Sequence, residues 1–324
     1  MNIQVVKKMI MVSWAFCLLF VMTPVGAAEQ TTFSRIVVFG DSLSDPGNAF
    51  VLRRALSTPP YDTLDALLVP EAPYAKGGHH FSNGATWIEQ FARPLGLAGS
   101  VRPAFQSSST KAANYAVGGA RAYADGDNVN LSAQVSAFLT DAGGMAPSDG
   151  LYVIEIGGND VRDALMVFAS GGDAGALISA SLASIGYNIG ALHAAGANKF
   201  LIWNTPDLRL TPSVLALDSM YPGMAIAAGM LGQAFNDGLD TLLGTLSGLP
   251  GITIKTLDVF QKVNDLAADP AAYGLEVVNA ACVTPNVPPF DCQEPDEYLF
   301  WDGIHPTRVV HGILAQEAAD LLAQ

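Results

Sequence analysis

The sequence predicts a three-layer α/β/α protein in which a mainly parallel central sheet carries helices on both faces. Short, almost uninterrupted apolar runs, typical of strands buried on both sides, alternate with longer segments whose apolar residues recur every three or four positions. Strands and helices that alternate in this way indicate parallel strands joined by crossover helices. No linker or internal repeat divides the chain after its N-terminal segment, so we expect a single domain over residues 29–324.

Four apolar runs are predicted as the strands of this sheet, at residues 36–39, 151–156, 200–203 and 252–257. Five amphipathic stripes are predicted as helices, at residues 87–95, 131–139, 178–192, 231–246 and 310–322. Residues 57–78 contain several prolines and glycines without periodicity, which predicts a long surface insertion. Open parallel sheets bind ligands at the carboxyl ends of their strands, so the residues that follow each strand are the first candidates for a site.

Residues 1–28 are predicted to be a cleaved secretory signal peptide. Lys7 and Lys8 precede an apolar run at residues 9–22, Pro24 interrupts that run, and small residues up to Ala28 suit a signal peptidase. The run is shorter than the roughly 20 residues that a membrane-spanning helix needs, which favours cleavage over retention as an anchor. We therefore expect a secreted or periplasmic protein whose mature chain has no integral membrane span.

Cys282 and Cys292 are the two cysteines that remain after the signal peptide is removed, and they are predicted to form a disulfide in an oxidising compartment. The bridge would close a short loop, so its entropic stabilisation would be no more than ~2–3 kcal/mol. It would hold the proline-rich stretch 283–298 rather than the whole fold. The chain has no CxxC motif, which disfavours redox chemistry.

The charge of the chain disfavours nucleic acid as a partner. Sixteen Lys and Arg stand against 30 Asp and Glu, a formal charge of −14; without residues 1–28 the balance is 14 against 30, or −16. Neutralisation of phosphates requires clustered basic side chains, which an acidic chain of this kind lacks. The sequence has no Walker A motif, dinucleotide fingerprint, HExxH motif or GxSxG elbow, so we expect no cofactor and no metal.

Two short motifs are interpreted as incidental. Residues 125–128 (Asp-Gly-Asp-Asn) resemble the start of a calcium-binding loop, but Val129 and Ser136 stand where later ligands would be required. The adjacent His79 and His80 are interpreted as surface residues near a substrate entrance, because successive residues seldom converge on one ion.

Polar residues follow the first two predicted strands. Ser42 would lie at the functional edge of the sheet, where its hydroxyl can act as a nucleophile if a base and oxyanion donors are near. Alternatively, Ser42 or Ser44 caps a helix. Asn159 can donate its amide hydrogens to a developing negative charge, or it can serve as a turn residue or helix cap.

Two further segments complete a possible catalytic set. The paired glycines Gly118 and Gly119 allow close backbone approach and an exposed N–H, although an ordinary turn is the alternative. Before the last helix, His305 can act as a general base with Asp302 orienting its ring. Alternatively, Asp302 caps the helix while His305 packs nearby. The presence of all these groups near expected strand ends favours nucleophilic catalysis.

These segments resemble the conserved blocks of the GDSL lipases and esterases, also called SGNH hydrolases. The matching blocks, in the expected order, are FGDSLSDPGN at 39–48, NYAVGGA at 114–120, GGND at 157–160 and DGIHP at 302–306. Residues 81–84, with Trp87 and Glu89, resemble a segment of the lipase-like branch of that family. The resemblance spans most of the chain and implies the flavodoxin-like, three-layer fold of SGNH hydrolases.

The resemblance implies Ser42 as nucleophile, His305 as base and Asp302 as its partner. The oxyanion hole would consist of the Ser42 N–H, the Gly119 N–H and the Asn159 side chain, with Gly118 as the alternative to Gly119. The implied activity is that of a secreted serine esterase that hydrolyses lipid or short acyl esters through an acyl-enzyme, without a metal. A carbohydrate acetylesterase, an acyltransferase and a non-catalytic exported binding module remain the alternatives, and the oligomeric state is not predicted.

Two features of the surrounding pocket are less regular. Arg209 stands where many relatives have glycine, which leaves the details of the pocket near it open. The aromatic residues Tyr61, Tyr74, Phe81 and Trp87 are predicted to line an apolar acyl pocket, with core packing or a loop coat as the alternative.

Overall fold

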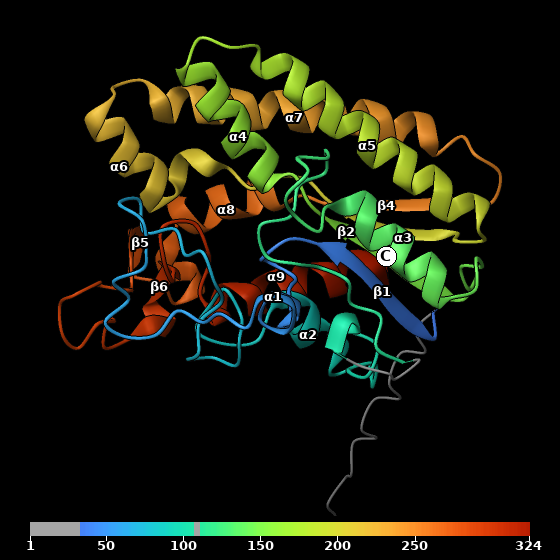
Figure 1. Ribbon diagram of the computed structural model, residues 1–324, viewed down its shortest axis with the longest axis horizontal. Helices are drawn as coiled ribbons and strands as arrows, with labels where there is room; N and C mark the ends of the chain where they lie inside the picture. Colours follow the sequence, from blue (N-terminus) through green and yellow to red (C-terminus); the bar gives the residue numbers. More distant parts are fainter. Residues whose placement is uncertain (1–32, 107–110) are drawn as a thin grey trace, which may run out of the picture. The chain divides into compact units, whose positions relative to one another are not determined.

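The computed structural model describes residues 33–106 and 111–324, all of which lie in one compact unit, Thr31–Gln324. Its central sheet contains four parallel strands in the order in which they occur in the chain (Figure 1). They are β1 (Arg35–Gly40), β2 (Gly150–Glu155), β3 (Lys199–Trp203) and β4 (Thr253–Leu257). These bounds confirm the four predicted strands to within two residues. The predicted signal peptide, residues 1–28, lies outside the described residues.

Helices cover both faces of the sheet, as the sequence predicts. One face packs on α3 (Leu131–Asp141), α4 (Gly158–Ala169), α5 (Ala174–Ala194) and α7 (Met224–Leu246). The other packs on α2 (Trp87–Ala92), α8 (Val259–Ala268) and α9 (Arg308–Ala323). Side chains of β1 alternate between the two cores, with Val37 and Phe39 on one side and Ile36 and Val38 on the other. Both faces of the strand are therefore apolar.

The remaining elements are short, and the sequence analysis did not predict them. They are α1 (Asn48–Arg53), α6 (Pro212–Met220), the 3-10 helices η1 (Ala104–Gln106), η2 (Leu208–Leu210), η3 (Pro270–Tyr273) and η4 (Pro295–Glu297), and a two-stranded parallel sheet of β5 (Val277–Ala281) and β6 (Tyr298–Phe300). Helices α4 and α8 were missed as well. A segment of one to three turns carries too few apolar positions to show a period.

The pairing register brings the strand ends level. Residues of β1 pair with β2 from Arg35 opposite Gly150 to Gly40 opposite Glu155. The chain that leaves β1 toward Ser42 and the chain that leaves β2 toward Asn159 therefore start from the same edge of the sheet. This is the edge at which open parallel sheets bind their ligands.

The insertion at residues 57–78 contains no helix or strand and many of its residues are exposed, as the sequence predicts, but two of its tyrosines are buried. Tyr61 and Tyr74 are fully buried and form a small core with Trp301 and the disulfide-bonded Cys282. Their rings meet edge to face, with 5.5 Å between the centroids of Tyr61 and Tyr74 and 5.6 Å between those of Tyr74 and Trp301. A long-range aromatic cluster, which no local periodicity could indicate, therefore anchors the surface insertion to the rest of the domain.

The predicted disulfide between Cys282 and Cys292 is present, with 4.9 Å between the two Cα atoms. It closes the segment that follows β5. Asp291, next to Cys292, pairs with Lys76 of the insertion. The bridge therefore lies beside the small core that contains Tyr74, and it ties that core to the end of β5.

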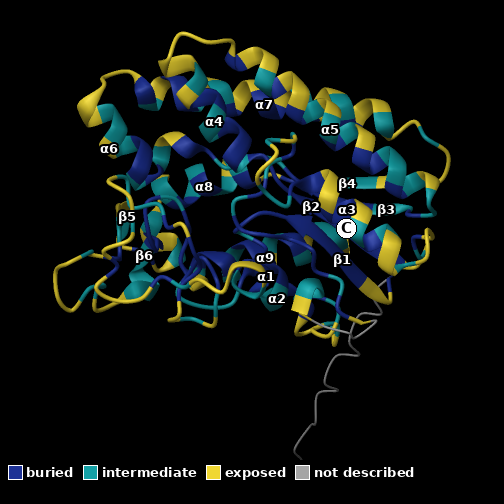
Figure 2. Ribbon diagram, viewed as in Figure 1, coloured by how far each residue is buried: buried dark blue, intermediate teal, exposed yellow. Residues whose placement is uncertain are grey.

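Among the described residues, α5 is the one helix long and apolar enough to cross a membrane by length and composition. Ile178, Ile185, Ile189 and Leu192 on its inner side are buried in the main core. Figure 2 shows exposed residues along the outer sides of α5 and α7. The inner side of α5 is thus part of the core that covers the sheet.

His311 gives a stability prediction for the contact between α2 and α9. Its ring is buried, its Nδ1 accepts a hydrogen bond from the Trp87 N–H at 3.2 Å, and burial lowers its pKa to about 3. Below pH ~6.5 the unfolded chain takes up a proton at this residue that the folded protein does not, so stability is lost as the pH falls toward 3. Between pH 7 and pH 5, the wild-type protein should lose about 2 kcal/mol more unfolding free energy than His311→Asn.

Urea unfolding of both proteins at the two pH values measures this difference. Asparagine retains an oxygen acceptor for the Trp87 N–H and removes the titrating group. Parallel pH dependences in the two proteins would show that His311 does not contribute.

Candidate active site

Ser42, His305 and Asp302 form a continuous hydrogen-bonded chain at the carboxyl end of the sheet. The Nε2 of His305 lies 2.8 Å from the Oγ of Ser42, and its Nδ1 lies 2.7 Å from the Oδ2 of Asp302. Ser42 follows β1, whereas the other two residues lie between β6 and α9. All three side chains are buried. The structure thus brings together the three residues that the sequence analysis selected as nucleophile, base and orienting acid.

The Asp302 carboxylate is held by several donors. Its Oδ1 accepts from the backbone N–H groups of Ile304 at 2.9 Å and of His305 at 2.8 Å, which forms a tight turn after β6. The carbonyl of His305 accepts from the Trp301 N–H at 2.8 Å, and the Gly303 N–H donates to Leu68 of the insertion at 2.9 Å. The position of the carboxylate beneath the imidazole is therefore determined by backbone hydrogen bonds.

Tyr74 is a residue of this site that the sequence analysis did not assign to the triad. Its hydroxyl donates to the Oδ2 of Asp302 at 2.9 Å, the same oxygen that contacts His305. Burial and the neighbouring carboxylate raise the pKa of Tyr74 well above its usual range, so the hydroxyl stays protonated and remains a donor. No local pattern could have indicated this contact, which joins residues 228 positions apart.

Replacing Tyr74 with phenylalanine is expected to lower kcat about tenfold. A hydrogen bond to a charged group is worth about 1.5–3 kcal/mol, and ~1.4 kcal/mol corresponds to a factor of ten in rate. The Tyr74 hydroxyl also holds the Asp302 carboxylate in the orientation that receives the imidazolium, so its loss should change kcat more than KM.

Steady-state kinetics across pH measures both effects. Tyr61→Phe is the matched control, because the buried Tyr61 hydroxyl has no hydrogen-bond partner among the described residues. Equal profiles for Tyr74→Phe and Tyr61→Phe would show that the Tyr74 hydroxyl only fills space.

The two glycines of the loop at residues 114–120 differ in whether their N–H groups are already hydrogen-bonded. The Gly118 N–H donates to the Oδ2 of Asp45 at 2.8 Å, and a Cβ at Gly118 would lie 2.1 Å from the Phe81 ring. Gly119 has a φ of +84°, which L side chains rarely adopt, and its N–H has no acceptor within residues 33–106 and 111–324. Of the two N–H groups, that of Gly119 is therefore the one available to a ligand.

Asp45 connects this loop to the segment that contains Ser42. Besides Gly118, the backbone N–H groups of Gly47, Asn48 and Ala49 donate to its carboxylate. Burial nevertheless raises its pKa to about 6. Asp45 belongs to the first conserved block, which is the signal that could have identified it.

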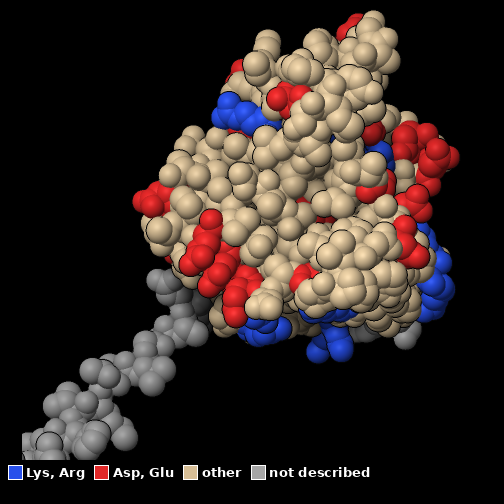
Figure 3. All heavy atoms as spheres, turned by 90° about the vertical axis from the view of Figure 1, so that its left-hand side faces the viewer, with Lys and Arg blue, Asp and Glu red and all other residues tan. Residues whose placement is uncertain are grey.

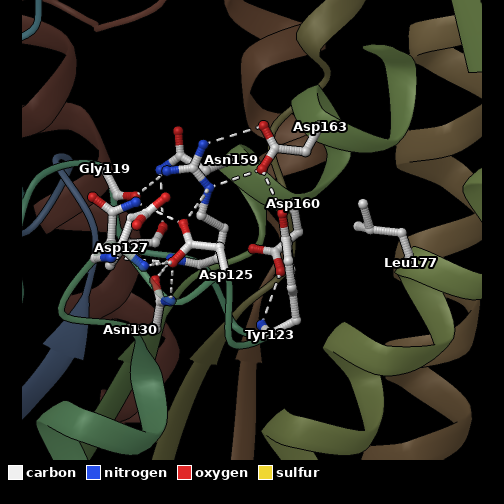
Figure 4. Close-up of polar contacts among 12 residues, drawn as sticks. Gly119, Tyr123, Asp125, Asp127, Asn130, Asn159, Asp160, Asp163 and Leu177 are labelled. Atoms are coloured by element: carbon white, nitrogen blue, oxygen red, sulfur yellow. Dashed lines mark hydrogen bonds and ion pairs between the residues drawn. The ribbon is translucent and has the colours of Figure 1, made fainter. Parts of the chain in front are cut away.

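Asn159, in the first turn of α4, lies against the same loop. Its Nδ2 donates to the carbonyl of Ala120 at 3.0 Å and lies 3.3 Å from the Oδ2 of Asp41. Figure 4 shows the loop of Gly119 and the start of α4 joined by a polar network. Arg121 donates to the Gly119 carbonyl and contacts Asp163 of α4 through Nε at 2.8 Å. Arg121 therefore links the loop that contains Gly119 to the helix that contains Asn159.

Two buried carboxyls lie behind the serine. Burial raises the pKa of Asp41 to about 6, and burial together with the charge of Asp41 raises the pKa of Glu155 well above its usual range. Both shifts favour the neutral forms of these carboxyls, of which Asp41 is the residue before Ser42. Fewer negative charges here favour the formation of an anion at this edge of the sheet.

A pocket of about 50 Å³ opens beside the serine. Its polar lining residues include Ser42, Asn159, Arg162 and His305. Its apolar wall is formed by Leu43, Pro206, Leu208, Val214 and Ile304. Figure 3 views the side of the protein on which α6 lies; mainly uncharged side chains cover it, with acidic residues toward the edges.

The predicted aromatic lining of this pocket was wrong, since none of the four aromatic residues lines it. Tyr61 and Tyr74 belong to the small core beside the disulfide. Trp87 lies in the core under α2 and donates from Nε1 to Ser44 at 2.9 Å. Phe81 packs against the His305 ring, with 5.3 Å between centroids, and so supports the imidazole.

The incidental motifs have structural roles. His80 is buried rather than exposed at an entrance; its Nε2 lies 2.8 Å from Glu89, whose carboxylate accepts from the Thr86 N–H at the start of α2. The Asp125 carboxylate accepts hydrogen bonds from Asn128 and Asn130. Within the described part of the chain, no three His, Cys, Asp or Glu residues are grouped so that they could hold a metal ion.

Arg209 does not line the pocket. Its Nε pairs with the Asp207 carboxylate at 2.6 Å, and its Nη2 donates to Asn264 of α8 at 3.0 Å. The departure from glycine at this position therefore leaves the described pocket wall unchanged.

A three-layer α/β fold with hydrogen-bonded serine, histidine and aspartate side chains at the strand ends is the framework of a serine-type hydrolase. Residues 36–318 match the model of the GDSL-like Lipase/Acylhydrolase family, and the chain belongs to that family. The protein is a carboxylic ester hydrolase of this class. The predicted family and fold class are thus confirmed.

The chain is similar to several known proteins. A GDSL esterase/lipase of Arabidopsis thaliana is 26% identical over 86% of this chain and 89% of its own. A phosphatidylcholine-sterol acyltransferase of Aeromonas hydrophila is 27% identical over 96% of this chain and 97% of its own. The crystal structure of an extracellular lipase from Streptomyces rimosus aligns with a TM-score of 0.39 and 16% identity, over 89% of this chain and 99% of that one.

Proposed function

We propose that the protein is an exported serine esterase that cleaves carboxylic esters of short acyl chains through an acyl-enzyme on Ser42. The observation that carries this proposal is the hydrogen-bonded chain from Ser42 through His305 to Asp302, which borders a small pocket with an apolar wall. Nucleophile, base and orienting acid are already within hydrogen-bonding distance of one another, as this chemistry requires.

In the proposed first step, the Ser42 hydroxyl attacks the ester carbonyl while His305 accepts its proton through Nε2. The contact between Nδ1 and Asp302 stabilises the resulting imidazolium and keeps the ring in one orientation. His305 then donates the proton to the departing alkoxide, which leaves as an alcohol. The acyl group remains bound to the Oγ of Ser42. Water, deprotonated by the same imidazole, releases the carboxylic acid in the second half of the reaction.

The negative charge on the tetrahedral intermediate would be stabilised by the N–H groups of Ser42 and Gly119 and by the Asn159 amide. The weaker of the two Asn159 contacts, 3.3 Å to Asp41, is the one that a substrate oxygen would replace. The 3.0 Å contact to Ala120 would keep the amide in place during that exchange. Fixed donors of this kind need little reorganisation when the charge develops.

The size of the pocket supports short acyl groups. The pocket beside Ser42 has a volume of about 50 Å³ and an apolar wall, which suits a small acyl group. We therefore propose acetyl to butyryl esters as preferred substrates, with acetylated sugars included among them. A panel of acyl lengths, phospholipids and acetylated sugars measures this preference.

An acyltransferase activity is the second candidate, and the similarity to the Aeromonas acyltransferase over 96% of the chain favours it. The first half of the reaction would be the same. In the second half, an alcohol acceptor would take the acyl group in place of water. Product analysis with and without a sterol or simple alcohol separates transfer from hydrolysis.

Export belongs to the proposal as well. Residues 1–28 would be removed as a signal peptide, and residues 29–324 would form the mature catalytic domain. The disulfide between Cys282 and Cys292 supports an oxidising destination, because such bridges rarely persist in a reducing cytosol. N-terminal sequencing of the protein recovered from periplasm and medium tests both the cleavage site and the location.

Covalent labelling tests the central step. A fluorophosphonate probe should modify the purified protein once, and peptide mass spectrometry should locate the adduct on Ser42. The same preparation should release nitrophenol from 4-nitrophenyl acetate. Absence of both reactions would favour a binding module that has the fold without the catalysis.

A further inference from the structure

Arg162 is a positively charged residue of the pocket for which the proposed chemistry has no use. It lies on α4, three residues after Asn159, and lines the same pocket as Ser42 and His305. Residues three apart on a helix are neighbours on its surface, so Arg162 and Asn159 face the pocket from one side of α4.

Within the described residues, the Arg162 guanidinium makes no hydrogen bond and no ion pair. Three carboxylates have charges that act on Arg162, and each of them accepts hydrogen bonds from other donors. Asp163 binds Arg121 and the Tyr123 hydroxyl, Asp65 accepts from the backbone of its own loop, and Asp41 accepts from the Leu43 N–H. Among residues 33–106 and 111–324, none therefore engages the donors of Arg162, which lines the pocket.

The absence of a partner is notable in an acidic chain, in which 30 carboxylates stand against 16 basic side chains. Two arginines elsewhere in the described structure, Arg209 and Arg308, each pair with an aspartate. Burial lowers the pKa of Arg162 from its usual value, although an arginine remains charged at neutral pH. A partly buried cation without a counterion gains strongly from an anion that enters the pocket.

We propose that Arg162 binds an anionic group of the substrate, a carboxylate or a phosphate, that lies a few atoms from the scissile ester. The guanidinium presents parallel N–H donors that match both groups in a two-point contact. This inference rests on the proposed esterase function, because the ester itself must reach Ser42. It specifies the substrate class as acidic esters, with the charge on either the acyl or the alcohol portion.

Two matched substrate pairs distinguish the source of the charge. Monoethyl succinate and ethyl butyrate share a four-carbon acyl chain and differ in the terminal carboxylate. 1-Butyrylglycerol-3-phosphate and 1-butyrylglycerol differ in a phosphate on the alcohol portion. The wild-type kcat/KM should favour the anionic member of at least one pair by tenfold or more, and the pair that shows it identifies the side of the ester that Arg162 meets.

Arg162→Gln should reduce that preference at least tenfold, chiefly through KM, and Arg162→Lys should retain part of it as a point charge. Arg209→Gln is the matched control, since that arginine is already paired with Asp207 and does not line the pocket; its preference should equal that of the wild type. Equal preference in wild type and Arg162→Gln for both pairs would overturn the inference.

A binding measurement keeps the test independent of turnover. Calorimetry with the Ser42→Ala variant should show binding of the preferred anionic ester that weakens at least tenfold when Arg162→Gln is added. Failure of the wild type to hydrolyse all four esters would contradict the proposed function, whereas calorimetry with monoethyl succinate and 1-butyrylglycerol-3-phosphate would still decide the role of Arg162. Unchanged binding in the double variant would refute that role.

Discussion

Replacing His305 with alanine is expected to lower kcat for a short acyl ester by about 10⁵- to 10⁶-fold. The Nε2 of His305, 2.8 Å from Ser42, is positioned to accept the serine proton, and no other histidine in the described residues contacts that hydroxyl. Without a base the alcohol is a poor nucleophile, and the leaving alkoxide receives no proton. Residual activity should come only from substrate binding and the oxyanion donors.

The comparison with Ser42→Ala makes this prediction specific. Groups that act as one unit do not contribute additively, so Ser42→Ala should show a similar loss, and the double variant should lose little more. Kinetics with 4-nitrophenyl butyrate provides the rates, and circular dichroism with thermal unfolding checks that each variant is folded. Activity of a folded His305→Ala within a hundredfold of the wild type would place the base elsewhere.

Replacing Asp302 with asparagine is expected to lower kcat by about 10⁴-fold, the loss typical of such a change in a serine triad. Asp302 accepts two backbone N–H groups at Oδ1, and both the imidazole and the Tyr74 hydroxyl at Oδ2. An amide has one oxygen, so either orientation of asparagine sets its NH₂ group against donors. The His305 ring would then lose its favoured tautomer and its support as an imidazolium.

Kinetics from pH 6 to pH 9, with Asp302→Ala as the control, tests this reasoning. The alanine variant removes the acceptor without introducing a donor beside the His305 ring. Its kcat should therefore fall, but the His305 ring should be forced into the wrong tautomer less strongly than in Asp302→Asn. Retention of more than one tenth of the wild-type kcat by Asp302→Asn would show that the carboxylate charge is not required.

The large losses of kcat expected for His305→Ala and Asp302→Asn concern the triad itself. The smaller loss expected for Tyr74→Phe concerns the residues that hold the triad in place. Tyr74 reaches Asp302 from the insertion, and Phe81 packs against the imidazole. The two residues come from the segment between α1 and α2, which contributes no strand to the central sheet. The geometry of the triad is therefore coupled to packing outside the sheet, and Tyr74→Phe measures that coupling directly.

The sequence alone determined the central sheet and the segments that meet at its edge. β1, β2 and β3 are mostly apolar runs buried on both faces, a pattern that depends only on neighbouring residues and is visible without coordinates. The carboxyl ends of parallel strands share one edge, so Ser42 and Asn159 could be assigned to a common site from their places after β1 and β2. The conserved blocks then added the family, which the comparisons confirm.

Only the tertiary structure decided how this site is supported and what its pocket presents. The engagement of Gly118 by Asp45, the hydroxyl of Tyr74 on Asp302 and the position of Arg162 in the pocket are all relations between parts of the chain with no shared local pattern. The predicted aromatic pocket failed for the same reason, since Tyr61 and Tyr74 are buried by contacts with residues near the C-terminus. Periodicity reports which face of an element is apolar, whereas the partner that covers or leaves open a given side chain depends on how the elements pack.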